Sequence, residues 1–442
     1  MEEIKKSLGS VIITKEIATD IKKSVKNTAD FGKKIKEYIT QNTTNFLDVI
    51  LFGAILIGAS DIHIEPQEDK VRIRIRLDGV LQDITFFSQE TYHNLLSRIK
   101  LLSKIKLNIT EKPQDGRFTV VVENALIEMR TSSLPSEYGE SIVIRILNPK
   151  NLIELSALGL RKDLYRILEK EIKRPNGMIV VSGPTGSGKT TTLYAFLLQI
   201  QNSEIKIITI EDPIEYHLTG ISQTQVAPEK GYNFSEGLMS IVRQDPDIIL
   251  VGEIRDLETA KIALQASLTG HLVLSTIHTN NAAGTIPRLI DLGADLSSVA
   301  SALKMVVGQR LVRKICKECS ILVKPSKEEL VEIKTGLKNI PENILEEIGI
   351  SKNLNQIKIP KIKEGGCKIC NFTGYKGRKG IFEVFLIDAQ MEKFILTSPS
   401  VASIKELLIK KGMVTIYQSG LIEIVLGETT LKEVKKVVEA DE

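Results

Sequence analysis

The fold is decided by the stretch Met178-Ile179-Val180-Val181-Ser182-Gly183-Pro184-Thr185-Gly186-Ser187-Gly188-Lys189-Thr190-Thr191. Its first part is an apolar run of strand length, and residues 183–190 fit the pattern G-x-x-x-x-G-K-[ST]. A helical stretch follows over residues 191–201. This order of strand, glycine-rich loop and helix is the context in which the motif cradles phosphate groups. The alternative is a glycine-rich turn that holds no ligand.

Each residue type in the loop has a chemical reason to be there. The glycines let backbone N–H groups close on phosphate oxygens, Lys189 is expected to bridge the β- and γ-phosphates, and the Thr190 hydroxyl is expected to bind Mg²⁺. The residues expected to contact the nucleotide are Gly183, Pro184, Thr185, Gly186, Ser187, Gly188, Lys189, Thr190 and Thr191. The sequence therefore predicts ATP and Mg²⁺ as ligands.

A second apolar strand, over residues 248–251, ends in Gly252 and Glu253. From such a strand end a carboxylate faces the γ-phosphate, so Glu253 is expected to activate water. Gly252 stands where many phosphate-loop enzymes carry a metal-associated Asp, so Mg²⁺ is expected to rely on Thr190 and waters. The alternative is that Glu253 is a solvated residue at a strand end.

The surrounding pattern predicts an α/β core. Apolar strands at 178–182, 205–210, 248–251 and 272–276 alternate with helical stretches, which is typical of a mostly parallel sheet. Before the core, a buried helix at 46–58 and an alternating strand ending in Asp78-Gly79 indicate a small α+β domain with a hairpin. The predicted parts are a short, poorly patterned segment 1–45, an α+β domain 46–150, an ATPase core 151–315, a zinc subdomain 316–385 and a helical tail 386–442.

Composition excludes several classes of protein. The chain has 442 residues, 42% of them hydrophobic, which excludes a single small module and a disordered chain. Its net charge of +4 and 5% aromatic content give little basis for binding a nucleic-acid backbone or stacking on bases. The N-terminus lacks the apolar core of a signal peptide, and the apolar run at 46–58 is shorter than the roughly 18 to 20 residues that span a bilayer.

All four cysteines fall into two C-x-x-C pairs, Cys316 with Cys319 and Cys367 with Cys370. Each pair has the spacing of a zinc knuckle, although the 47 residues between the pairs (367−319−1) exceed a typical ribbon. Four thiolates would fill a tetrahedral zinc site and leave no open position, so the zinc is expected to be structural. A redox pair or free buried thiols are the alternatives.

These motifs resemble the secretion ATPase superfamily, and within it the type II secretion and type IV pilus assembly (extension) ATPases, from about residue 46 to residue 437. Besides the phosphate loop, the blocks that carry the resemblance are SDIHIEP (60–66), PQDGR (113–117), IEDPIEY (210–216), RQDPD (243–247) with VGEIRD (251–256), and TGH (269–271) with STIHTN (275–280). The GCKIC segment at 366–370 is similar to the metal subdomain of the assembly ATPases, which pilus retraction relatives typically lack. The resemblance implies a RecA-like core preceded by a PAS-like domain.

The resemblance also implies roles for two further blocks. Glu211 and Asp212 are expected beside the phosphates and the metal, whereas carboxylates after a strand often only cap a turn. His271 and His278 are expected to sense the γ-phosphate, with a structural hydrogen bond as the alternative for either. Because they are seven residues apart along a strand, their side chains point to opposite faces, and they are poor joint metal ligands.

Several arginines complete the predicted site. Arg130 and Arg145 of the first domain match the family segment whose arginines reach the γ-phosphate, and Arg243 matches a third. A fourth family position, four residues before Arg243, is Met239 here. By contrast, the arginines at 72, 74 and 76 share one strand face and are expected to be solvated or part of an interface, and His63 is expected to be structural.

The resemblance implies a cytoplasmic ATPase that forms a homo-hexamer and associates peripherally with the inner membrane. Its expected partners are an inner-membrane platform protein and a membrane-anchored docking protein of a pilus or secretion machine. A DNA-uptake or nucleic-acid translocating motor is the alternative, although no direct contact with nucleic acid is expected from the charge and aromatic content. A scaffold without hydrolysis is a further alternative, disfavoured by Lys189, Thr190 and Glu253.

Overall fold

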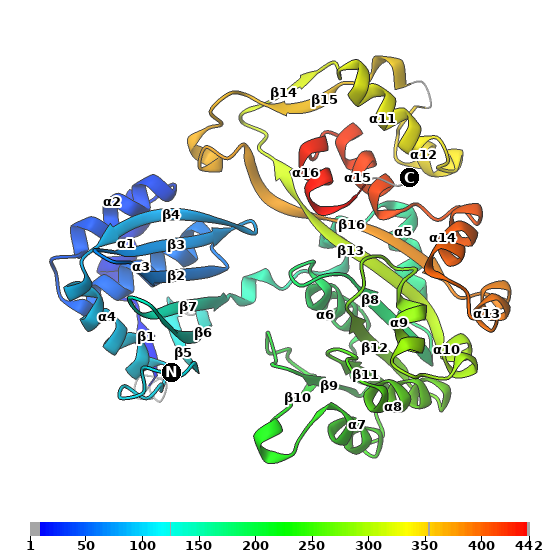
Figure 1. The fold of residues 1–442 in the computed structure, drawn as a ribbon, viewed down its shortest axis with the longest axis horizontal. Coiled ribbons are helices and arrows are strands. Elements are labelled where there is room, and N and C mark those ends of the chain that lie inside the picture. Colours follow the sequence, from blue (N-terminus) through cyan, green and yellow to red (C-terminus); the bar gives the residue numbers. More distant parts are fainter. Residues whose placement is uncertain (1–8, 124, 352–353, 440–442) are drawn as a thin grey trace. The chain divides into compact units, whose positions relative to one another are not determined.

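The computed structural model describes residues 9–123, 125–351 and 354–439, and the chain divides into two compact units (Figure 1). The first unit contains the chain up to Asn151 together with Cys316–Cys319 and Ile362–Lys376. The second contains Leu152–Ile315, Ser320–Lys361 and Gly377–Glu442. None of the helices in the described ranges is both long and apolar enough to cross a bilayer.

The first unit is built on a seven-stranded sheet with the order β1-β5-β6-β7-β2-β3-β4. The strands are β1 (Ser10–Ile12), β2 (Asp61–Pro66), β3 (Val71–Leu77), β4 (Val80–Phe87), β5 (Gln114–Val122), β6 (Ala125–Ser136) and β7 (Gly139–Leu147). β1 pairs with β5 in parallel, and the other neighbours are antiparallel. The predicted hairpin is confirmed: Asp78 and Gly79 join β3 to β4 with φ values of 48° and 84°, as a two-residue turn of this type requires.

Helices cover this sheet, including helices that the sequence did not predict. They are α1 (Lys15–Ser24), α2 (Thr28–Tyr38), α3 (Thr43–Ile57) and α4 (Gln89–Leu102). The predicted buried helix at 46–58 is confirmed as part of α3. The segment before it differs from the prediction, because Ile21, Phe31 and Ile35 are completely buried in the core of the unit. A Cβ on Gly53 would lie 2.1 Å from the Phe31 ring, so this glycine makes room for α2 to pack on α3.

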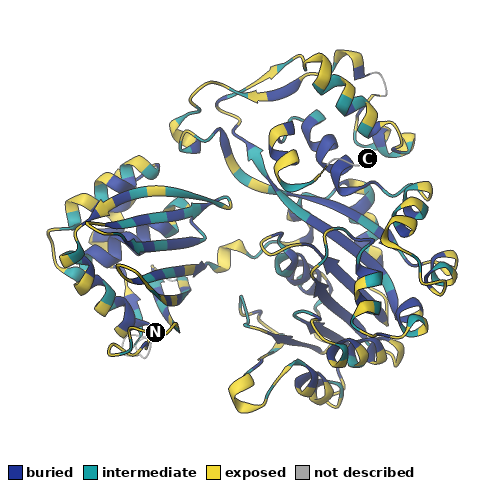
Figure 2. Cartoon of the chain, viewed as in Figure 1, coloured by how far each residue is buried: buried dark blue, intermediate teal, exposed yellow. Residues whose placement is uncertain are grey.

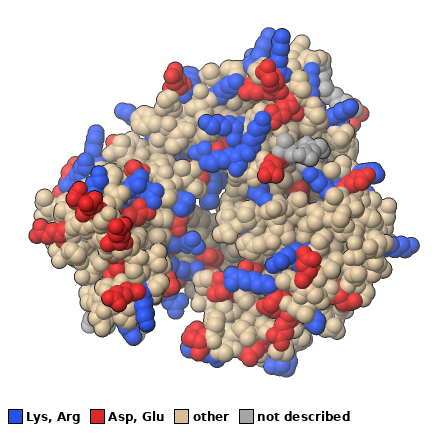
Figure 3. All heavy atoms as spheres, in the orientation of Figure 1, with Lys and Arg blue, Asp and Glu red and all other residues tan. Residues whose placement is uncertain are grey.

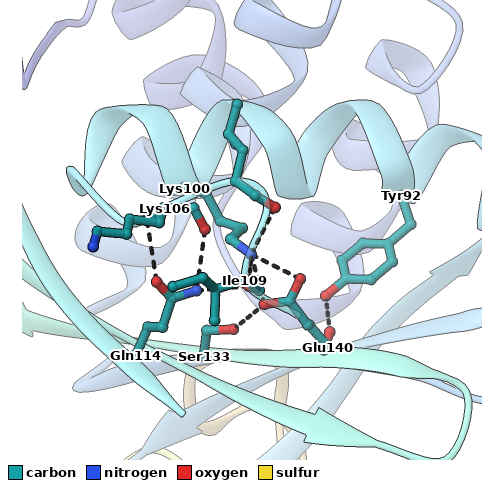
Figure 4. Close-up of polar contacts among 8 residues, drawn as sticks. Tyr92, Lys100, Lys106, Ile109, Gln114, Ser133 and Glu140 are labelled. Carbon is teal, nitrogen blue, oxygen red and sulfur yellow. Dashed lines mark hydrogen bonds and ion pairs between the residues drawn. The ribbon is translucent and has the colours of Figure 1, made fainter. Parts of the chain in front are cut away.

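A buried ion pair fixes the connection between α4 and β5 (Figure 4). The Lys100 ammonium donates to both carboxylate oxygens of Glu140 at 2.8 and 2.9 Å and to the Ile109 carbonyl at 2.8 Å. Ser133 Oγ donates to the same carboxylate at 2.6 Å, and the Tyr92 hydroxyl donates to the Glu140 carbonyl. Lys100 is 1% exposed and Glu140 4%, so both charges are out of water and are compensated by these partners and by the Leu107 carbonyl, which also accepts from Lys100.

The second unit contains the predicted α/β core, with a seven-stranded sheet in the order β10-β9-β11-β12-β8-β13-β16. Its strands are β8 (Gly177–Ser182), β9 (Ile207–Glu211), β10 (Ser222–Gln225), β11 (Ile248–Val251), β12 (Leu272–Ile277), β13 (Leu303–Ile315) and β16 (Tyr375–Leu386). The pairs from β10 through to β13 are all parallel. Strands β8, β11 and β12 are buried along their whole length, as Figure 2 shows in dark blue. The mixed α/β fold with a parallel sheet is therefore confirmed.

Helices on both sides of this sheet complete the unit. They are α5 (Lys162–Glu171), α6 (Lys189–Ile200), α7 (Phe234–Val242), α8 (Leu257–Leu268), α9 (Thr285–Asp291) and α10 (Leu296–Ala302), and later in the chain α11 (Lys327–Leu337), α12 (Glu342–Glu347), α13 (Ala389–Ile395), α14 (Val401–Lys410), α15 (Ile416–Val425) and α16 (Leu431–Val437). A small sheet pairs β14 (Ser320–Val323) with β15 (Ile359–Ile362).

The structure divides the C-terminal part differently from the predicted boundaries. β16 runs from 375 to 386 next to β13, so the predicted boundary at 385 falls inside a strand of the core sheet. The predicted helical tail is helical, but α15 is buried almost throughout and shares a hydrophobic core with α11, α16 and the core strands. The first eight residues of the predicted 1–45 segment, and the last three of the tail, lie outside the described residues.

Candidate active site

The glycine-rich loop connects a buried strand to a helix in the way the motif requires. β8 lies between β12 and β13 at the centre of the sheet, and α6 begins at Lys189. Gly183, Gly186 and Gly188 have φ values of 151°, 79° and 91°, a region that side chains rarely adopt. A Cβ on Gly183 would lie 2.6 Å from the Gln309 carbonyl oxygen. The loop therefore needs glycine, and its N–H groups lie at the start of α6, where a helix attracts anions.

Lys189 lies in this loop with a buried ammonium. Its Nζ donates to the carbonyl oxygens of Gly183 at 2.8 Å and Pro184 at 3.0 Å. Burial lowers the pKa of Lys189 to about 8, and the charge of Arg310 acts in the same direction against the opposing effect of Glu253. The two carbonyls give the Lys189 ammonium hydrogen bonds but no opposite charge. A phosphate group would supply that negative charge, and hydrogen bonds to ionised acceptors are stronger than those to carbonyls.

Glu253 lies at the same edge of the sheet as the phosphate loop. β11 and β8 are both parallel to the strand between them, β12, so their carboxyl ends meet at one edge. The Glu253 carboxylate is 12% exposed, pairs with Arg255 and lies 3.5 Å from Nε2 of His278. Burial lowers the pKa of His278, and the charge of Lys189 lowers it further, so this imidazole is held neutral. The structure thus brings three predicted residues, Lys189, Glu253 and His278, to one site.

The carboxylate of Glu211 is buried and already bound within the protein. It accepts from Thr209 Oγ1 at 2.6 Å, from Gln223 Nε2 at 3.1 Å and from the Tyr194 hydroxyl. These contacts tie β9 to α6 and β10. Its neighbour Asp212 is exposed at the end of β9. Of the two predicted carboxylates, only Asp212 therefore presents its side chain to solvent at this edge.

Two predicted residues lie at the opposite edge of the sheet. His271 directly precedes β12, its Nδ1 lies 3.0 Å from the Ala266 carbonyl, and its own carbonyl accepts from Gly177 at the start of β8. Arg243 follows α7 ahead of β11, is exposed, and donates to Ser240 Oγ at 3.3 Å. Six residues of β12, at about 3.3 Å each, separate this edge from His278. Within one chain, neither residue reaches the phosphate loop.

Sequence reasoning missed two residues beside the loop, Gln309 and Arg310 on β13. Gln309 Oε1 accepts from Thr192 Oγ1 at 2.8 Å, and its Nε2 lies 2.9 Å from where a Cβ on Gly188 would be. Arg310 donates to the Gln309 and Asn280 carbonyls. The only signal in the sequence is that these two polar residues follow an apolar stretch within β13, and no motif links them to the loop.

The predicted arginines of the first unit lie in one row across its sheet. Arg130 of β6 is the direct partner of Arg145 of β7, and the row continues to Arg117 of β5 on one side and to Asp61 of β2 on the other. Arg145 Nε donates to Asp61 Oδ1 at 3.1 Å but keeps its side chain 58% exposed. The row therefore offers guanidinium groups at a surface.

The predicted shared face of Arg72, Arg74 and Arg76 is confirmed. Their positions alternate with buried residues along β3, and they pair with Asp83, Glu65 and Asp61. Figure 3 likewise shows acidic side chains beside basic ones over much of the visible surface. These arginines form a neutralised polar face, as expected for a solvated or interface surface.

The cysteines form a second candidate site, suited to a metal. Their ligand atoms all lie within 4.8 Å of one another, and three Sγ pairs are 3.6 to 3.8 Å apart. Four sulfurs at about 2.3 Å from a tetrahedral zinc ion would be about 3.8 Å apart. Burial would raise the pKa of the Cys370 thiol, but the N–H groups of Cys367 and Gly374 lower it to about 7. The residues present fit zinc, with N–H···S hydrogen bonds supporting the ligand.

Comparison with known proteins shows which families and proteins have a sequence similar to that of this chain. The family described as "Type II/IV secretion system protein" matches residues 39–436. The chain is 43% identical over 396 residues to type II secretion system protein E of Dickeya dadantii, covering 89% of this chain and 75% of that protein. It is 36% identical over 427 residues to the type IV pilus assembly ATPase PilB of Myxococcus xanthus, covering 96% and 72%.

A solved structure, the pilus retraction motor PilT with bound ADP, superposes with a TM-score of 0.58 at 26% identity. The match covers 88% of this chain and 96% of PilT. Similarity in sequence and in structure therefore extends through both the phosphate-loop core and the unit before it. The chain belongs to the type II/IV secretion system protein family.

Proposed function

We propose that this chain is an ATP-hydrolysing motor that powers type IV pilus assembly or type II protein secretion. The observation that carries the proposal is the meeting of Lys189, Glu253 and His278 at the edge where the phosphate loop opens. PilB of Myxococcus xanthus is named as an ATPase of type IV pilus assembly, and a Vibrio cholerae protein that is 40% identical over 393 residues is named type II secretion system ATPase E, which supports the same activity here.

The residues at this edge have separate roles in hydrolysis. The loop N–H groups and Lys189 bind the phosphates, and Glu253, positioned by Arg255 and His278, orients and activates the attacking water. Thr190, at the start of α6, would hold Mg²⁺, which supplies charge neutralisation on the phosphates when bound. His278, whose pKa is lowered by burial and by the charge of Lys189, lies 3.5 Å from the Glu253 carboxylate, and there it senses whether a γ-phosphate is present.

Residues away from this edge need a second chain to act. Arg243 and His271 lie at the opposite edge, so a role at a γ-phosphate requires the site of an adjacent subunit in a ring. Arg130, with a side chain 19% exposed, and Arg145, 58% exposed, offer two guanidinium groups for the same purpose. A homo-hexamer in which a PAS-like first domain moves against a RecA-like core accounts for these positions.

The remaining expectations complete the proposal. The cysteine cluster holds a structural zinc ion, which its sulfur spacing supports. The chain works in the cytoplasm at the inner membrane, bound to a platform protein and a membrane-anchored docking protein. ATP hydrolysis then moves pilin or pseudopilin subunits out of the membrane.

Two substitutions test the activity. Lys189→Ala is expected to abolish ATP binding, because the phosphates lose their buried cation. Glu253→Gln is expected to keep ATP binding but to reduce hydrolysis by about 100-fold or more, since general-base catalysis contributes on that scale. Glu236→Gln, an exposed change on α7, is the matched control. Wild-type phosphate release by both site variants would refute the assignment.

A nucleic-acid translocating motor is the alternative function. The near-neutral charge of +4 disfavours it. A titration with DNA at several salt concentrations separates the two functions, because a strand-binding motor shows a steep salt dependence. Deletion of the gene would then distinguish loss of pili from a block in secretion of a folded protein.

A further inference from the structure

Arg310 lies beside the phosphate loop because of strand register. β13 pairs with β8 so that Gly308 is opposite Ser182, which places the next two residues of β13 alongside the loop. Nη1 of Arg310 lies 3.2 Å from where a Cβ on Gly183 would be. The guanidinium is therefore packed against the first glycine of the loop.

The hydrogen bonds of Arg310 are unusual for a partly buried arginine in this chain. Nη1 donates to the Gln309 carbonyl at 3.0 Å and Nη2 to the Asn280 carbonyl. Other arginines with little exposure, Arg161 and Arg313, form two-pronged pairs with a carboxylate. Among the described residues, Arg310 has no carboxylate partner within ion-pair distance.

The nearest acidic influence is already engaged elsewhere. The negative charge of Glu383 favours the charged form of Arg310. The Glu383 carboxylate itself accepts hydrogen bonds from the backbone N–H groups of Ala282 and Ile416. On the other side of the loop Glu253 is paired with Arg255. Glu253 and Glu383 offset part of the positive charge of Lys189 and Arg310, but among the described residues neither cation has a carboxylate within ion-pair distance, so a polyanion could contact both directly.

We propose that Arg310 binds the phosphate chain of the nucleoside triphosphate directly, from the same subunit, as a second cation beside Lys189. This rests on the proposed ATPase function and adds a substrate contact to it. Through its hydrogen bond to Asn280, the same guanidinium connects the phosphates to the loop that follows His278. Arg310 is then a binding residue whose effect grows with the number of phosphates on the ligand.

The test compares Arg310→Gln with wild type in the full-length chain. Binding of ATP, ADP and AMP is measured by calorimetry, with phosphate release measured in parallel. ATP binding is expected to weaken by about 10- to 100-fold, the scale of a hydrogen bond between charged groups, whereas AMP binding changes little. Arg288→Gln, an exposed change of the same charge on α9, is the control and is expected to bind all three ligands like wild type.

The outcomes separate this inference from the proposed function. If wild type hydrolyses ATP and Arg310→Gln binds ATP as tightly, the inference about Arg310 is wrong while the ATPase function stands. If wild type binds ATP without hydrolysing it, the ATPase function fails, and the ATP-to-AMP comparison still decides the role of Arg310. Should Arg310→Gln not fold, Arg310→Met removes the charge and keeps an apolar stem. Equal ATP affinity in that variant would also overturn the inference.

Discussion

Removing the buried ammonium of Lys100 should locally unfold part of the first unit. Lys100→Met keeps the length of the side chain but leaves the Glu140 carboxylate buried with a single described side-chain partner, Ser133. The Ile109 carbonyl loses one of its two described donors and keeps only Gln114 Nε2. The segment between α4 and β5 is expected to open, because the ammonium donates to the Leu107 and Ile109 carbonyls of this segment and to Glu140 of β7 (Figure 4).

The size of the effect follows from the burial of the pair. Breaking a buried ion pair by removing one partner costs about 3 to 5 kcal/mol. That cost corresponds to an increase in the local opening constant of between about 100-fold and several thousand-fold. Removing both charges, with Lys100→Met and Glu140→Gln together, should recover much of this energy, because no uncompensated charge then remains buried.

Hydrogen exchange of the full-length chain, followed by mass spectrometry, measures this opening directly. Peptides covering residues 103–114 and 139–147 should lose protection in Lys100→Met, and the double variant should regain part of it. Lys106→Met is the matched control, because Lys106 is exposed in the same segment. Protection unchanged to within 1 kcal/mol in Lys100→Met would refute the argument that the ammonium compensates a buried carboxylate.

Three further outcomes follow from the structure. Burial raises the pKa of Asp48 to about 6, so the folded chain keeps a proton that the unfolded chain releases, and this group lowers the stability of the fold as pH rises from about 4 to 6. Asp48→Asn should therefore raise the free energy of unfolding by about 1 to 3 kcal/mol at pH 7.5 and by less at pH 4.5. Urea titrations at the two pH values measure this difference. The chain should contain one zinc ion by elemental analysis, and its loss in Cys319→Ser should lower the melting temperature; full zinc content in that variant would contradict the site. His278→Asn should slow ATP hydrolysis, because it removes the imidazole beside the Glu253 carboxylate, and wild-type phosphate release in that variant would contradict this role.

The centre of the second unit could be predicted from sequence because its signals are local. Strands β8 and β11 are short apolar runs, and the phosphate loop and the Gly252-Glu253 pair directly follow them. Parallel strands bring these ends to one edge without further information. The same reasoning would have placed His278 at that edge and His271 at the other, whereas the family resemblance assigned both to the γ-phosphate.

Features that depend on contacts distant in sequence could not be predicted. Helices α1 and α2 are short and mostly polar, so each buries only a few apolar residues, and they are stabilised by packing on α3. Arg310 comes to the phosphate loop only through the pairing of β13 with β8. The buried position of Glu211 depends on Tyr194 and Gln223, which no pattern connects to it.

The order of β13 and β16 in the core sheet has a consequence for how this chain tolerates change in length. The chain leaves the sheet at the end of β13 and returns in β16, and these two strands are neighbours. The sheet therefore holds the two ends of the intervening excursion together, whatever its length. Doubling a loop whose ends are fixed costs only about 0.6 kcal/mol. The connections between Cys319 and Cys367 that lie outside the core shared by α11 and α15 can accordingly lengthen, or accept an inserted reporter domain, while the phosphate loop after the strand next to β13 keeps its geometry.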